Sequence, residues 1–133
     1  MKSLQFSSKR MCVYARRGMV TTGNALASSA GIRMLEKGGN AVDAAIACAA
    51  VLCVVEPTAN GLGSDNFALI WNKDRLYGMN SSGRSPALFS KEAVQAKHGK
   101  DTETMPVSGW TPVTVPGAVA GWVSMHEKFG SLP

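Results

Sequence analysis

The longest apolar run of the chain predicts a helix that is covered on several sides. Residues 44–55 are apolar without interruption, and Pro57 ends the run. A helix that is apolar on all of its faces is packed inside a protein rather than on its surface. We therefore expect a helix over 41–55 that is covered by other structure, which a single small domain seldom provides.

A second helical pattern comes directly before this run. From Asn24 to Lys37 apolar residues fall on one stripe and polar residues on the opposite side. Gly38 and the glycine after it can adopt the positive φ that ends a helix, while Asn40 and Asp43 can cap the next one. So short a connector predicts an antiparallel pair, in which the first helix covers the outer side of the second.

The remaining patterns are shorter and favour an α+β arrangement. We expect strands at 67–71 and 75–80, joined as a hairpin, and further short strands at 11–14, 19–22 and 113–115. Ser90 is expected to cap a short helix that Gly99 closes, and Pro116 to lie in the first turn of a last helix ending at Phe129. Since the two long helices follow each other without a strand between them, helices stacked on one face of an antiparallel sheet are favoured over a parallel βαβ array.

Composition and charge exclude several classes of protein. The formal net charge is +5, and much of it comes from early residues, namely Lys2, Lys9, Arg10, Arg16 and Arg17. Aromatic residues are not interleaved with them, so a solvated basic arm is favoured over nucleic-acid binding. The apolar run is shorter than the roughly 20 residues that span a bilayer, and no apolar segment of a secretory signal follows the start. We expect no nucleic acid or membrane as partner.

The three cysteines, Cys12, Cys48 and Cys53, form no Cys-x-x-Cys pair, so neither a zinc site nor a disulfide framework is supported. A reducing, cytoplasmic setting fits best. The loop with Gly61 and Gly63 follows a helix and precedes a strand, opposite to the order of a phosphate-binding glycine loop, and a tight turn is favoured. His98 and His126 are isolated, and a structural role is favoured for His126 over that of a base.

Arg84 is the best polar candidate for binding. It follows Gly83 and precedes Ser85 and Pro86, on a loop at the end of a strand that the proline stiffens. A planar guanidinium there could grip a carboxylate with two parallel hydrogen bonds. Spacing alone favours the alternative, which is an exposed arginine with no specific partner.

Several blocks together resemble the γ-glutamyltransferase (γ-glutamyltranspeptidase) family. They are Tyr14-Ala15-Arg16-Arg17-Gly18-Met19-Val20, Leu26-Ala27-Ser28, Lys37-Gly38-Gly39-Asn40-Ala41-Val42-Asp43-Ala44-Ala45, Val54-Val55-Glu56-Pro57, Gly61-Leu62-Gly63 and Val115-Pro116-Gly117-Ala118-Val119-Ala120-Gly121. The resemblance runs in order from about Tyr14 to the last residue.

This resemblance implies an N-terminal-nucleophile hydrolase with a four-layer αββα sandwich, made as a precursor that cuts itself. A threonine freed at the new N-terminus of a small subunit attacks the γ-glutamyl amide, with its own α-amine as base and without a metal or organic cofactor. In the family that threonine lies downstream of the segment seen here. Residues 1–133 would thus be the N-terminal part of a large subunit, an incomplete domain without a catalytic residue and inactive alone. Its partners would be the rest of the precursor and a small γ-glutamyl substrate.

One departure from the family concerns the substrate. Members that act on glutathione carry Arg-Glu-Thr-Ala-Pro after the hairpin, and that arginine binds the α-carboxylate of the glutamyl group. Aligning on Pro86 puts Ser82 at the arginine's position, with Arg84 two residues later, and the loop of four glycines becomes Gly63-Ser64-Asp65-Asn66. The segment looks more like the γ-glutamyltransferase-like branch, which includes acylases, with Arg84 and Ser82 as substrate-binding residues. The rival hypothesis is a non-catalytic truncated remnant or binding module of the same family.

Overall fold

The computed structural model describes residues 11–133, which form four helices and one β-hairpin. In chain order the elements are α1 (Ala25–Glu36), α2 (Ala41–Val55), β1 (Asn66–Asn72), β2 (Arg75–Ser81), α3 (Lys91–His98) and α4 (Ala118–Phe129). Lys2, Lys9 and Arg10 of the expected basic arm lie outside the described residues, whereas Arg16 and Arg17 are exposed. No helix within 11–133 is long and apolar enough to cross a bilayer.

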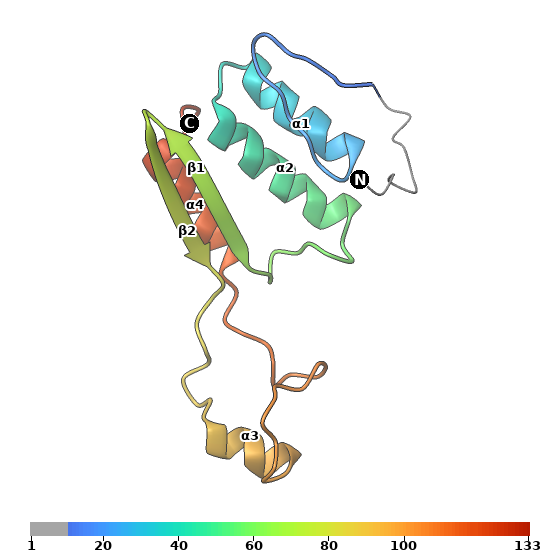
Figure 1. Cartoon of the computed structure of the whole chain (residues 1–133), viewed down its shortest axis with the longest axis vertical. Coiled ribbons are helices and arrows are strands. Elements are labelled where there is room, and N and C mark those ends of the chain that lie inside the picture. Colours follow the sequence, from blue (N-terminus) through green and yellow to red (C-terminus); the bar gives the residue numbers. More distant parts are fainter. Residues whose placement is uncertain (1–10) are drawn as a thin grey trace, which may run out of the picture.

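The predicted antiparallel helix pair is confirmed, and its connector has the expected chemistry. Gly38 has a φ of +91°, and the Asn40 side chain accepts hydrogen bonds from the first-turn amides of α2. The Asp43 carboxylate returns a bond to the Asn40 amide, which completes a capping box. The two helices lie side by side in Figure 1.

The helix pair packs closely because small residues face each other. Ala27 of α1 and Ala44 and Cys48 of α2 are buried, and a methyl group at Gly31 would lie 2.6 Å from Cys48 Sγ. Cys48 donates to the Ala27 carbonyl at 3.2 Å. Burial raises the pKa of the Cys48 thiol, so the side chain remains a neutral, small apolar group.

The predicted hairpin is confirmed as β1 and β2, and its turn lies between the two expected strands. Asn66 pairs with Ser81 and Asn72 with Arg75, and the turn residues Lys73 and Asp74 both have positive φ. Two successive residues of positive φ give the turn type whose twist matches that of antiparallel strands. One hairpin face contacts α4, where the Tyr77 and Phe129 rings meet edge to face at 4.9 Å.

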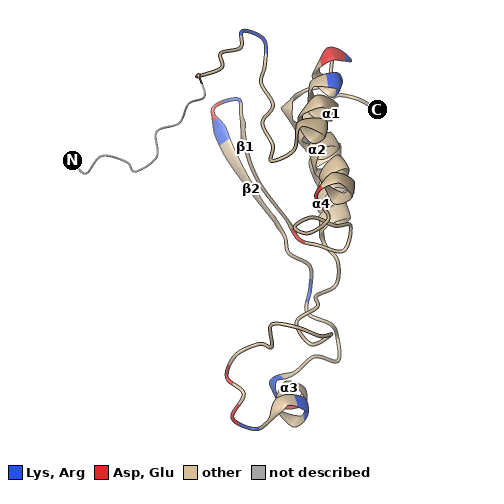
Figure 2. Cartoon of the chain, turned by 90° about the vertical axis from the view of Figure 1, so that its right-hand side faces the viewer, with Lys and Arg blue, Asp and Glu red and all other residues tan. Residues whose placement is uncertain are grey.

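The helices α1, α2 and α4 lie on one side of the hairpin, which confirms the α+β arrangement (Figures 1 and 2). The opposite face of the hairpin is apolar and open. Its residues are Phe67, Leu69, Trp71 and Leu76, which are 63%, 78%, 67% and 58% exposed. In this chain α2 is only partly covered, because Ala45, Ala50 and Val54 remain exposed.

The predicted short strands at 11–14, 19–22 and 113–115 are wrong, since none of these segments is a strand. A strand needs a hydrogen-bonded neighbour, and within the described residues β1 pairs only with β2. Residues 18–22 instead lie against the helix pair. A methyl group at Gly31 would lie 2.9 Å from Val20 Cγ1, and the Thr22 hydroxyl donates to the Asn24 carbonyl at 2.6 Å.

The start of α4 also differs from the prediction. The helix begins at Ala118 with Gly117 as its N-cap, so Pro116 precedes the helix instead of lying in its first turn. The physical reason is a tertiary contact that the sequence does not reveal. The Gly117 and Ala118 amides both donate to the Ser64 carbonyl, at 3.4 and 2.9 Å, and this backbone oxygen replaces a side-chain cap.

Residues 82–117 form an arm that extends away from the layered body and carries α3 (Figure 1). Ser90 caps α3 through a bond from the Ala93 amide, and Gly99 ends the helix, both as predicted. The arm exposes several large apolar side chains, among them Leu88, Val107 and Trp110.

Candidate functional site

Three loops meet where the hairpin ends and α4 begins. The first is 61–66, whose Ser64 carbonyl caps α4; the second is 81–86; the third is 113–117. Gly117 makes the meeting possible, because a Cβ at this position would overlap the Ser81 carbonyl oxygen. The chain therefore brings together segments that are about 20 to 50 residues apart in the sequence.

The loop with Gly61 and Gly63 forms the expected tight turn, since the Ser64 amide donates to the Gly61 carbonyl at 3.1 Å. The places where the backbone leaves no room for a side chain lie elsewhere. A Cβ at Gly63 would meet nothing, and one at Gly61 would only reach ordinary contact distance, whereas Gly83 and Gly117 have no room for one.

The backbone of Ser82 is held on both sides. Its amide donates to Asn80 Oδ1 at 3.0 Å, and its carbonyl accepts from the Thr114 hydroxyl at 3.2 Å. Two residues later, the Arg84 carbonyl accepts from the Val115 amide at 2.9 Å. These bonds fasten the loop after β2 to the segment before α4.

Ser82 and Arg84, the two residues that the sequence singles out, line one open cavity of about 560 Å³. Its other walls come from Asn80, Ser81 and Gly83 on one side and from Val115, Pro116, Gly117 and Ala120 on the other. Arg84 is exposed and forms no ion pair within residues 11–133. The cavity thus offers hydroxyls, an amide and a guanidinium beside an apolar wall, a set that suits an acyl chain ending in a carboxylate.

Sequence reasoning missed Asn80 and Thr114, which hold the loop. An asparagine two residues before the amide that it accepts from is a known turn signal, and Asn80-Ser81-Ser82 has that spacing. Thr114 gives no comparable local signal, because its partner lies 32 residues away.

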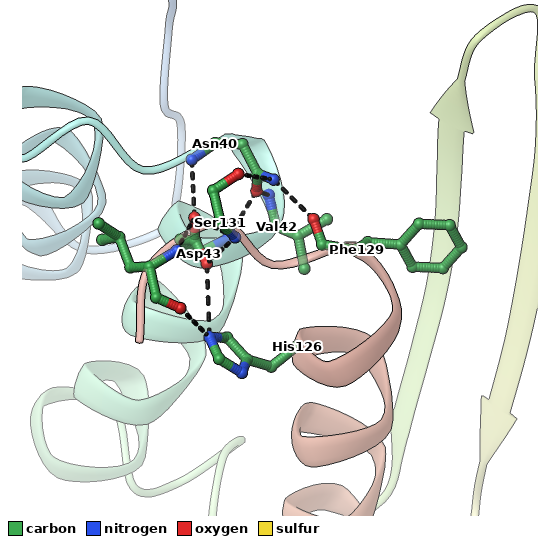
Figure 3. Close-up of polar contacts among 7 residues, drawn as sticks. Asn40, Val42, Asp43, His126, Phe129 and Ser131 are labelled. Atoms are coloured by element: carbon green, nitrogen blue, oxygen red, sulfur yellow. Dashed lines mark hydrogen bonds and ion pairs between the residues drawn. The ribbon is translucent and has the colours of Figure 1, made fainter.

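A second cluster of polar contacts joins the N-terminus of α2 to the end of α4. We call Asn40, Asp43, His126, Phe129 and Ser131 the Asp43 cluster (Figure 3). Asp43 is 6% exposed, and its carboxylate accepts from the Ser131 amide at 3.1 Å. Asn40 Nδ2 donates to the Phe129 carbonyl at 2.6 Å and approaches Ser131 Oγ at 2.7 Å.

His126 has a structural place in this cluster. Its Nε2 lies 2.8 Å from the Leu132 carbonyl, which can only accept, so Nε2 carries a proton and donates. The same nitrogen lies 3.8 Å from Asp43 Oδ1. His98 on the arm contacts the Thr111 hydroxyl at 2.8 Å, and within residues 11–133 no three His, Cys, Asp or Glu side chains gather as a metal ion would need.

Comparison with solved structures places this arrangement among acylases and transpeptidases. The crystal structure of cephalosporin acylase from Bacillus halodurans superposes with a TM-score of 0.86 and 50% identity, over 99% of this chain and 24% of that one. The γ-glutamyltranspeptidase of Helicobacter pylori gives a TM-score of 0.77 and 32% identity, over 92% of this chain and 35% of that one.

Sequence comparison agrees. The family described as gamma-glutamyltranspeptidase matches residues 27–133, and the chain belongs to this family. The glutathione hydrolase-like YwrD proenzyme of Bacillus subtilis (strain 168) is 38% identical over 125 residues, which cover 90% of this chain and 22% of that protein. The chain therefore spans about a fifth of the length of this curated relative.

Proposed function

We propose that this chain is the N-terminal part of the large subunit of a γ-glutamyltransferase-like amide hydrolase or acyltransferase. The observation that carries the proposal is its 50% identity over 99% of its length with one segment of a cephalosporin acylase. The name of the Bacillus subtilis relative, a proenzyme, supports a precursor that is cut into subunits. A reducing, cytoplasmic setting remains part of the proposal.

In this proposal the catalytic group lies outside the chain. A threonine at the N-terminus of a small subunit attacks the amide carbon of the donor, and its α-amine takes the hydroxyl proton and gives it to the leaving amine as the C–N bond breaks. The acyl group then passes from the threonine to water or to another amine, which frees the hydroxyl again. Sequencing the gene beyond the codon for Pro133 tests this directly. A reading frame that continues to a threonine at a cleavage site supports the proposal, and a stop codon supports a non-catalytic remnant.

We propose further that the open hairpin face is covered by a second sheet, which would complete the αββα sandwich. The face presents Phe67, Leu69 and Trp71 to solvent, and apolar sheet faces of this kind pack on another sheet at about 10 Å. Replacing Leu69 by Asp should reduce dye binding by the isolated chain. The same change should abolish assembly where a second sheet is present.

An acylase chimera makes such tests possible. It carries this complete chain in place of the matching segment of the Bacillus halodurans acylase, whose remaining three quarters supply the rest of the enzyme. If the proposal is right, the chimera matures and hydrolyses an acyl donor with a terminal carboxylate. A chimera that folds and matures but never turns over any such donor would contradict it.

Arg84 is proposed to grip the donor carboxylate, with Ser82 beside it on the cavity wall. Replacing Arg84 by Lys keeps the charge but loses the two-pronged hydrogen bonding. Loss of charge-assisted bonds worth about 1.5–3 kcal/mol should raise KM of the chimera by one to two orders of magnitude. The matched control is Arg33→Lys, since Arg33 is exposed on α1. An unchanged KM for Arg84→Lys would leave the arginine without this role.

The position of the arginine should also decide the preferred donor. Ser82 lies where the glutathione-active members carry their arginine, and it lines the same cavity. Replacing Ser82 by Arg in the chimera should therefore increase kcat/KM for glutathione relative to the parent. The ratio of glutathione to acylase-type donor turnover is the quantity to measure.

A further inference from the structure

The loop that carries Arg84 is fastened by its backbone and not by its side chains. The Ser82 amide donates to the Asn80 side chain, and the Ser82 carbonyl accepts from the Thr114 hydroxyl. The Arg84 carbonyl accepts from the Val115 amide. Three hydrogen bonds over three residues leave this stretch little freedom to move independently of the segment before α4.

Gly83, which lies between Ser82 and Arg84, fixes the register of the loop. Gly83 has a φ of +80°, in the region that favours glycine, and a Cβ there would overlap the Val115 carbonyl oxygen. A shift of the loop by one residue would put Ser82 or Arg84 at this place, where neither side chain fits. Moving Arg84 to the position that Ser82 holds takes a shift of two residues, which would put Ser85 there, and this side chain does not fit either.

We infer that Asn80 and Thr114 are positioning residues that lock the loop register and so fix where the Arg84 guanidinium meets the donor carboxylate. The inference rests on the proposed function, because it needs Arg84 to bind the donor. It goes further by assigning roles to two side chains that act through hydrogen bonds to the Ser82 backbone. A fixed point of attachment makes the cavity selective for donors whose carboxylate lies at one distance from the scissile amide.

Thr114→Val and Thr114→Ser form a matched pair in the acylase chimera. Valine keeps the shape but loses the hydroxyl that donates to the Ser82 carbonyl, whereas serine keeps the hydroxyl. We expect Thr114→Val to raise KM for the donor roughly three- to tenfold with kcat nearly unchanged, as for one lost hydrogen bond, and Thr114→Ser to stay near the parent. Asn80→Ala should act in the same direction. Gly83→Ala is a stronger change that also risks the fold.

Hydrogen exchange of the Val115 amide gives a readout that does not depend on catalysis. Thr114→Val should speed this exchange by a similar factor, and Thr114→Ser should not. Unchanged exchange in Thr114→Val overturns the inference. Faster exchange together with an unchanged KM in Thr114→Val also overturns the inference, provided that Arg84→Lys raises KM. If Arg84→Lys leaves KM unchanged, the role proposed for Arg84 fails by itself, and the exchange result still decides whether Thr114 holds the loop.

Discussion

The Asp43 cluster should hold the chain after α4 in place, and Asp43→Asn tests this with little change in shape. The carboxylate oxygens accept from the Asn40 amide at 2.7 Å and from the Ser131 amide at 3.1 and 3.2 Å. Asparagine offers one acceptor and one amino group. In place of Oδ1, the amino group would face the Ser131 amide and lie near His126 Nε2. In place of Oδ2, it would face the backbone amides of Asn40, Ser131 and Leu132.

The size of the effect follows from the bonds that are lost. A hydrogen bond to a charged group contributes about 1.5–3 kcal/mol net, and we count the shared Ser131 bond once, at about 2 kcal/mol. Because about 1.4 kcal/mol corresponds to a factor of ten, local opening near Ser131 should become roughly 30-fold more populated. The capping box of α2 is weakened as well, which adds about 1 kcal/mol at the helix start.

Hydrogen exchange of the peptide that contains residues 128–133, read by mass spectrometry in the acylase chimera, measures this local opening without requiring two-state unfolding. We expect exchange at Ser131 and Leu132 to accelerate by one to two orders of magnitude. The matched control is Asp101→Asn, which removes an exposed carboxylate on the arm. Exchange that stays within twofold of the parent would show that the Ser131 bond to Asp43 contributes little.

Three further predictions concern the chain by itself. The isolated chain should bind an apolar dye strongly or form oligomers through its open hairpin face; light scattering that finds a monomer with a sharp thermal transition would contradict this. It should also not hydrolyse a γ-glutamyl anilide above the buffer rate, since within residues 11–133 no nucleophile is poised for acyl transfer; turnover that survives repurification would refute this. Finally, iodoacetamide at about pH 8 should modify the exposed Cys12 before Cys48, because burial raises the pKa of the Cys48 thiol. The stability due to the neutral Cys48 thiol is fully present below the pKa that this thiol has in the unfolded chain, and it is lost as pH rises through the pKa in the folded chain. Alkylation of Cys48 should therefore accelerate in alkaline solution. Equal alkylation rates for both thiols would contradict the burial of Cys48.

Local sequence signals predicted the helices and the hairpin well. Gly38, Asn40 and Asp43 mark the junction of α1 and α2 through capping chemistry that acts within four residues, and the Asn72-Lys73-Asp74 turn is also local. The predicted strands at 11–14, 19–22 and 113–115 failed because β-structure depends on a partner strand. Residues of high β-propensity without such a partner pack on helices or stay extended.

The candidate site was predictable only in part. Arg84 and its departure from the family pattern can be read from the residues around Pro86. The contacts that hold the site cannot, because the Thr114 hydroxyl donates to the Ser82 carbonyl 32 residues away and the Ser64 carbonyl accepts from the distant start of α4. The start of α4 was misplaced for the same reason, since a carbonyl from another loop caps the helix where the sequence shows only proline and glycine.

The narrow base of the arm has a consequence for how this segment can vary. Both ends of the arm are joined at its base by two hydrogen bonds, from the Thr114 hydroxyl to the Ser82 carbonyl and from the Val115 amide to the Arg84 carbonyl, so its outer part extends from a closed ring. The entropy of closing a loop grows slowly with its length, and material added or removed near Gly99 or Gly109 would leave that ring intact. The outer arm is thus free to acquire new lengths and sequences while the cavity below it keeps its geometry.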